Sequence, residues 1–205
     1  MAFPAIAAFF LSAFLFSPAF GQEYEASSNE TKVEHYPIDE ASSNETKVED
    51  YPIDQFMNTT QGIWVLNTTQ RNPQSCKKDT NVNMTANETY FYRSYEENDT
   101  IVNVSLVGEF GHFADDEDVR NLITITGGQT DVVAEVLLYR SQNNSCGVVL
   151  VTASISRESV SWLDVRVRGR PNDTENKYED CNRHFYIYVN ATKKNWTSPY
   201  RRDCP

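Results

Sequence analysis

Residues 61–69, QGIWVLNTT, form a short apolar run that begins after a glycine and ends in polar residues. Runs of this length that are rich in Ile, Val and Trp and bounded by turn formers are typical of β-strands. Six similar runs follow, separated by turn formers such as Gly, Asn and Ser. The seven expected strands cover residues 63–66, 89–95, 101–107, 122–126, 132–139, 148–153 and 162–167. Seven or eight regularly spaced strands predict an antiparallel barrel or sandwich.

Twelve N-x-S/T sequons are spread along the chain and predict a glycoprotein with a heavily glycosylated surface. Each occupied site must face solvent, and the glycans would serve solubility and secretion quality control or would mask the protein from host antibodies. The candidate residues are Asn29, Asn44, Asn58, Asn67, Asn83, Asn87, Asn98, Asn103, Asn143, Asn172, Asn190 and Asn195.

The sequons also predict which side chains face the interior, because side chains alternate between the two faces of a strand. Outward Asn67, Asn87 and Asn103 place residues of the opposite parity inside. This register gives an interior lined by Trp64, Leu66, Tyr90, Tyr92, Val102, Val104 and Leu106. In the last strand we expect the apolar face to be internal. That register puts Ser161, Leu163, Val165 and Val167 inside, and Trp162, Asp164, Arg166 and Arg168 on a solvated outer stripe.

The chain begins with an apolar stretch that is too short to span a bilayer. Residues 5–16 are apolar and small residues follow at 19–21, so we interpret residues 1–21 as a secretory signal peptide. The mature protein is therefore expected to be secreted and extracellular, with no segment held in a membrane.

Residues 25–39, EASSNETKVEHYPID, are repeated as residues 40–54, EASSNETKVEDYPID, with a single difference. The repeat is polar and acidic and has no apolar period, so we expect residues 22–54 to be a disordered arm. Tyr36 and Tyr51 lie between acidic residues and are candidates for sulfation. The arm would then engage a basic patch on a host protease or chemokine; the alternative is a solubilising spacer.

Four cysteines, Cys76, Cys146, Cys181 and Cys204, follow the expected signal peptide and predict two disulfides with three possible connectivities. No pair has the C-x-x-C spacing, so neither a metal site nor redox chemistry is expected. The acidic run at 115–118 lacks the spacing of a calcium loop and is expected to be a solvated loop.

Catalysis and nucleic-acid binding are not expected of this sequence. The three histidines do not group with a nucleophile, which argues against an enzyme and against a cofactor. The formal charge of −11, without clustered Lys and Arg, argues against a nucleic-acid partner. Near the C-terminus, residues 172–184 favour a short helix, followed by an extended tail over 185–205.

Gly62-Ile63-Trp64 resembles the G-x-W signature of the lipocalins, in which the Trp plugs the closed end of an eight-stranded barrel. Residues 55–61 resemble the short N-terminal helix of that family, and the cysteine layout is similar to that of tick salivary lipocalins such as the histamine-binding proteins. The resemblance covers residues 55–205. It implies an all-β domain, an eight-stranded antiparallel up-and-down barrel with a short helix near each end. It also implies that Cys76 pairs with Cys204 and Cys146 with Cys181.

The resemblance further implies noncovalent capture of a small host inflammatory or haemostatic mediator, as evasion of host defence. Amine-binding members share a pattern of Cys-Asp-aliphatic, Glu-Leu-Trp and Cys, whose acidic residues pair with the ammonium group. Here the matching stretches are Cys146-Gly147-Val148 and Ser161-Trp162-Leu163, so the motif lacks its carboxylates, although Glu109 or Glu135 could supply one.

We therefore expect a lipid mediator such as a leukotriene, thromboxane or fatty acid rather than histamine or serotonin. The expected contacts are Trp64, Tyr90, Tyr92, Val104, Leu106, Glu135 and Leu163. The protein is expected to be a monomer. The alternative function is a protein-binding inhibitor of host complement, coagulation or chemokines that acts through loops or the acidic arm.

Overall fold

The computed structural model describes residues 51–113, 119–172 and 177–205. The expected signal peptide, Tyr36, the sequons at Asn29 and Asn44, and the acidic run at 115–118 lie outside the described residues. The elements are α1 (Ile53–Met57), β1 (Ile63–Thr68), β2 (Ser75–Met84), β3 (Glu88–Glu97), β4 (Thr100–Gly111), β5 (Leu122–Thr126), β6 (Val132–Arg140), β7 (Cys146–Ile155), β8 (Glu158–Arg168) and α2 (Glu179–Thr192).

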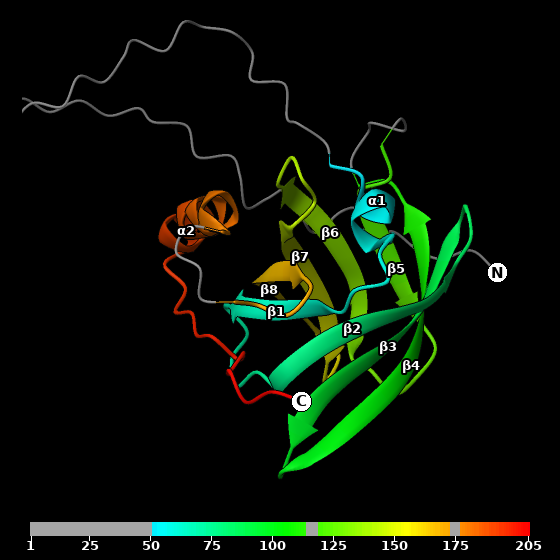
Figure 1. Cartoon of the computed structure of the whole chain (residues 1–205), viewed down its shortest axis with the longest axis horizontal. Coiled ribbons are helices and arrows are strands. Elements are labelled where there is room, and N and C mark those ends of the chain that lie inside the picture. Colours follow the sequence, from blue (N-terminus) through cyan, green and yellow to red (C-terminus); the bar gives the residue numbers. More distant parts are fainter. Residues whose placement is uncertain (1–50, 114–118, 173–176) are drawn as a thin grey trace, which may run out of the picture. The chain divides into compact units, whose positions relative to one another are not determined.

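The eight strands form a closed antiparallel barrel in which each strand pairs with the next in the chain and β8 pairs with β1 (Figure 1). This order is the up-and-down arrangement, and closure leaves no sheet edge open. The expected fold class is confirmed, and each of the seven expected strands lies within an observed one. Neither helix in the described part of the chain is both long and apolar enough to cross a membrane.

The strand that the sequence did not reveal is β2, SCKKDTNVNM. Its inward positions carry Lys77 and Asp79, each 4% exposed, so the usual alternation of apolar and polar residues is missing. The strand forms because β1 and β3 supply backbone partners on both sides and the barrel interior supplies a charged partner, Arg93, for Asp79.

The short helix α1 packs against one end of the barrel (Figure 1). Ile53, Phe56 and Met57 are at most 2% exposed and belong to the same cluster as the barrel interior. The helix begins two residues before the expected start of the domain at 55, because Ile53 is part of this apolar contact. Tyr51 lies edge to face against Tyr139 of β6, with 5.3 Å between ring centroids, so the last residues of the expected arm pack on the barrel.

The second helix lies farther along the chain than expected. It spans residues 179–192 rather than 172–184, and Phe185, expected in the extended tail, is in its middle. Phe185 and Val189 are four residues apart and therefore share one face, which packs on the outer side of β7 and β8. The helix ends at Lys193, whose φ of 52° is left-handed.

Two disulfides fix the outer layer to the barrel, with the expected pairing. Cys146–Cys181 joins β7 to α2, and Cys76–Cys204 joins β2 to the C-terminal segment. Closures of this kind typically stabilise a fold by about 2–4 kcal/mol each. The C-terminal segment covers Trp64, whose ring lies edge to face with Tyr200 at 5.5 Å.

The register expected from the sequons is confirmed for β4, where Leu106 is 1% exposed and Asn103 faces solvent. It is wrong for β1. A bulge between Val65 and Asn67 changes the parity, so Trp64 and Leu66 face outward together with Asn67 and pack under the outer layer. The lipocalin-type Trp therefore packs against the outside of the barrel wall.

The register is also wrong for β3 and β8. Asn87 lies in the turn before β3, so its outward direction does not set the parity of the strand, and Tyr90 and Tyr92 face solvent. In β8 the apolar set, Leu163, Val165 and Val167, packs outward. Trp162, Asp164 and Arg166 face inward and are buried, and Arg168 reaches the backbone of α1. The expected solvated stripe is absent because α2 covers the outer face.

Asn67 does not have the exposure that a glycan requires, unlike the other nine sequons in the described ranges. Its side chain is 8% exposed and donates a hydrogen bond to Asn182 of α2 at 3.1 Å. We expect Asn67 to be unglycosylated in protein secreted from eukaryotic cells and Asn103, on exposed β4, to be a usable site. Glycopeptide mass spectrometry checks both positions. A folded product carrying a glycan at Asn67 would contradict this packing of α2.

Candidate ligand site in the barrel

Six charged side chains project into the barrel and form a layer across it. They come from β2, β3, β6 and β8, and all are at most 4% exposed. The residues are Lys77, Asp79, Arg93, Glu135, Asp164 and Arg166. Burial of single charges is costly, so the geometry of their pairing determines whether this barrel can close.

Glu135 of β6 is at the centre of the layer. Arg166 of β8 binds it in a bidentate way, with Nη1–Oε2 at 2.6 Å and Nη2–Oε1 at 2.8 Å. Arg93 of β3 donates Nη2 to the same Oε1 at 2.8 Å. Burial alone would raise the pKa of Glu135, but the two guanidinium groups hold it well below its ordinary value. Side chains from three strands therefore meet across the interior.

The other two carboxylates are also occupied. Arg93 donates Nε and Nη2 to the two oxygens of Asp79, at 2.8 and 2.7 Å. Asp164 accepts Nη2 of Arg166 at 3.3 Å and the hydroxyl of Thr68 at 2.6 Å. Each carboxylate thus has at least one guanidinium partner. No acidic group of the layer is left over to pair with a cationic ligand.

Lys77 differs from the two arginines. Its Nζ lies 5.7 Å from the ring centroid of Trp162, and within the described residues it makes no hydrogen bond or ion pair. Burial lowers the pKa of Lys77 from 10.5 to about 8, with Asp164 acting in the opposite direction. The amine is mostly protonated at neutral pH and can still accept an anionic partner.

Three further donors of the layer are buried without an acceptor in the described part of the chain. They are Nη1 of Arg93, Nε of Arg166 and the indole Nε1 of Trp162. Buried N–H groups are normally satisfied, so unsatisfied ones indicate a site that can receive an acceptor. Together with Lys77, they give the layer an excess of donors over acceptors.

Trp162 also borders a groove of about 940 Å³ at the barrel end opposite α1. The connection between β1 and β2, the β7–β8 hairpin and the segment after α2 form its walls. The lining residues are Thr69, Gln70, Arg71, Asn72, Pro73, Ile155, Val160, Ser161, Trp162, Lys194, Asn195, Trp196 and Thr197. The indole of Trp162 therefore links this opening with the donor-rich layer beneath it.

The structure brings together only some of the expected ligand contacts. Glu135 and Leu106 lie inside the barrel, and Val104 packs half-buried against the internal apolar cluster. The remaining four are outside it. Trp64 and Leu163 pack beneath the outer layer, and Tyr90 and Tyr92 are exposed on the surface.

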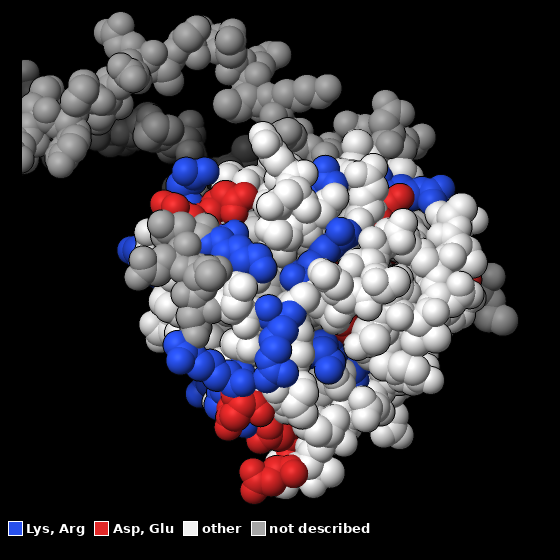
Figure 2. All heavy atoms as spheres, in the orientation of Figure 1, with Lys and Arg blue, Asp and Glu red and all other residues white. Residues whose placement is uncertain are grey.

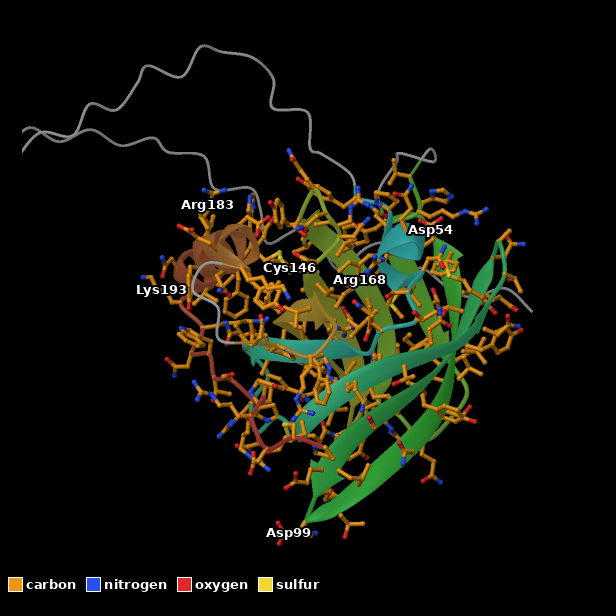
Figure 3. All side chains as sticks on the ribbon, viewed as in Figure 1. Asp54, Asp99, Cys146, Arg168, Arg183 and Lys193 are labelled. Carbon is orange, nitrogen blue, oxygen red and sulfur yellow. A yellow bond between two sulfur atoms is a disulfide. The ribbon has the colours of Figure 1, made fainter. Side chains whose placement is uncertain are left out.

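The expectation of an apolar interior is wrong, because the barrel also encloses residues that the sequence did not indicate as internal: Lys77, Asp79, Arg93, Trp162, Asp164 and Arg166. The even positions of β8 could have indicated a charged interior, because Asp164 and Arg166 alternate there with apolar residues. The same alternate spacing of charged residues, Lys77 and Asp79, occurs in β2, which was not expected as a strand. Figure 3 shows side chains within the barrel and Cys146 on the side toward α2.

Removal of the central carboxylate should be strongly destabilising. Glu135→Gln leaves two guanidinium groups buried without their counter-charge, and we expect the free energy of unfolding to fall by about 3–5 kcal/mol. Urea denaturation measures this loss. Glu109→Gln, on exposed β4, is the matched control and should change stability by less than about 0.5 kcal/mol. Equal stability of both variants would contradict the network.

Lys77→Met should have the opposite effect. The folded protein holds the pKa of Lys77 near 8 while the unfolded chain has 10.5, so protonation of the folded state costs up to about 3 kcal/mol at neutral pH. We expect the variant to be more stable than the wild type at pH 7, with a gain that shrinks as pH rises from 8 to 10. A gain that is constant with pH, or a loss, would show that Lys77 is not desolvated.

No known protein-family profile and no curated protein sequence matches this chain. Solved structures do match its fold. The AM182 serotonin complex has 15% identity and a TM-score of 0.59, over 77% of this chain and 94% of that chain. The siderocalin Ex-FABP has 6% identity and a TM-score of 0.52, over 71% and 93% of the two chains.

Lobster apocrustacyanin A1 has 9% identity with this chain and a TM-score of 0.51, over 74% of this chain and 81% of that chain. Similarity at such low identity shows a shared fold. Together with the closed up-and-down barrel of eight strands and its two disulfides, it shows that this chain has the lipocalin fold.

Proposed function

We propose that this protein is a secreted scavenger that sequesters a small apolar molecule with a carboxylate head, such as a fatty acid, leukotriene or thromboxane. The excess of buried donors beside the groove is the observation that carries this proposal. In keeping with the resemblance to tick salivary lipocalins, the captured molecule would be a host mediator and its removal would serve evasion of host defence.

The carboxylate head would bind between the Lys77 ammonium and the indole N–H of Trp162. A charge-assisted hydrogen bond there adds an acceptor to a region that has more donors than acceptors. The hydrocarbon tail would lie in the groove against Ile155, Val160 and Trp196. Deprotonation of Lys77 removes the cation, so affinity should fall as pH rises above about 8.

A biogenic amine suits this interior less well. An ammonium group needs a carboxylate partner when it leaves water. Glu135, Asp79 and Asp164 already bind arginine, and release of one of them would leave a guanidinium buried without its counter-charge. The AM182 structure holds serotonin in the same fold, so the preference proposed here depends on side chains and not on barrel topology.

The head-group claim can be tested with a matched pair of ligands, arachidonic acid and arachidonyl alcohol. We expect titration calorimetry on the full secreted chain at pH 7 to show the acid binding at least about tenfold more tightly. In Lys77→Met this preference should be lost while the alcohol binds as before. Equal affinity of the wild type for acid and alcohol would contradict the assigned head-group site, and tight binding of serotonin would contradict the preferred ligand class.

A second candidate is a protein-binding inhibitor of host complement, coagulation or chemokines. The meeting of Arg93, Glu135 and Arg166 across the interior favours it, because these side chains fill space that a ligand would otherwise use. Loops or the arm with Tyr36 and Tyr51 would then make the contacts. Absence of binding by lipid acids, lipid alcohols and amines would favour this function.

A further inference from the structure

Lys and Arg side chains gather on one face of the barrel domain although the whole chain has a net charge of −11 (Figure 2). Figure 2 shows them across the middle of the face, while acidic side chains lie mainly toward its rim. The contacts described below connect four cations from distant parts of the sequence. We call this set, Lys78, Arg140, Arg168 and Arg170, the basic face.

Lys78 and Arg170 lie over Trp64. The Lys78 Nζ is 4.7 Å and the Arg170 guanidinium carbon 5.8 Å from its ring centroid. Arg170 also donates to the backbone carbonyl of Arg202 at 2.9 Å and to that of Cys204. The Cys76–Cys204 disulfide holds this C-terminal segment on the barrel, so the positions of these cations are fixed by the fold.

Arg168 lies at the end of the barrel near α1 (Figure 3), and Arg140 contacts Gln55 of the same helix. Arg168 donates Nε to the carbonyl of Phe56 at 2.9 Å, and Arg140 donates Nη1 to the side-chain oxygen of Gln55 at 3.1 Å. Burial and the nearby charge of Arg140 lower the pKa of Arg168, which places the two cations close together. Arg168 of β8 and Lys78 of β2 pair with the adjacent β1 residues Ile63 and Trp64.

The partners of these cations are carbonyl and amide oxygens and an aromatic ring, all of which are uncharged. Within residues 51–113, 119–172 and 177–205, neither Lys78, Arg140, Arg168 nor Arg170 forms an ion pair. Their side chains are thus held in place while their charges remain uncompensated by those residues. The sequence has no run of clustered Lys and Arg, and these four cations come together only when the barrel closes.

We propose that the basic face binds a sulfated polysaccharide of the heparan sulfate type. Guanidinium groups that are held in place bind sulfate oxygens with directed, charge-assisted hydrogen bonds. Single-stranded nucleic acid also needs an exposed aromatic platform, and Trp64 is only 5% exposed. The rings that these cations approach, Trp64 and Phe56, are 5% and 1% exposed, so they offer no apolar side chain for insertion into a lipid surface.

Binding of the full secreted chain to immobilised heparin tests this proposal, which does not rest on the proposed lipid site. We expect retention at pH 7.4 and about 0.15 M NaCl, where charges farther apart than about 8 Å are largely screened. Lys78→Gln with Arg170→Gln should lower affinity for a heparin octasaccharide at least about tenfold, because each lost cation removes a charge contact and lowers the salt dependence.

Arg183→Gln with Lys193→Gln is the matched control. It removes the same charge from two exposed residues, one in α2 and one at its C-cap (Figure 3), and should bind within about twofold of wild type. Unchanged thermal unfolding of both double variants shows that the fold is intact. Failure of the wild type to bind heparin, equal losses in the two variants, or equally strong binding of unsulfated heparosan or polyglutamate would each overturn the proposal.

Discussion

The central constraint in this barrel is the carboxylate of Glu135, which is fully buried and bound by the guanidinium groups of Arg93 and Arg166. These three residues come from β6, β3 and β8, so the contact spans the interior rather than one stretch of wall. A buried ion pair adds little net stability compared with well-packed apolar residues, but loss of one partner is very costly. The network therefore specifies which strands face one another more than it raises total stability.

This constraint also determines what the interior can accept. Three acidic and three basic side chains balance in charge, and the acidic ones already have partners. Lys77, Trp162 and one nitrogen of each arginine provide donors that have no acceptor within the described residues. The proposed acid with an apolar tail would give an acceptor to Lys77 and Trp162 without breaking an existing pair. An amine must compete with an arginine for its carboxylate.

The sequence was sufficient to predict the barrel, because the strand runs, the turn formers, the G-x-W motif and the cysteine layout all indicate the same fold. It was not sufficient to predict which side chains face the interior. Leu163, Val165 and Val167 are an ordinary apolar strand face, and their position outside becomes understandable only when Phe185 and Val189 of α2 are seen to cover them. The bulge between Val65 and Asn67 puts Trp64 on the same face as Asn67, and no local pattern reveals it. Leu106 and Glu135 were expected inside and are found there, whereas Lys77 lies in a strand without an apolar period.

The claim that the barrel holds a carboxylate against its unpaired donors is tested most directly at the indole of Trp162. The chain has three tryptophans, and Trp64, which does not line the groove, serves as the internal reference. In a ¹⁵N–¹H NMR titration with arachidonic acid, we predict a downfield shift of the Trp162 indole proton as it gains an acceptor, with the Trp64 signal unchanged. A Trp162 signal that does not move while the acid binds would contradict the account, because the head group would then lie elsewhere.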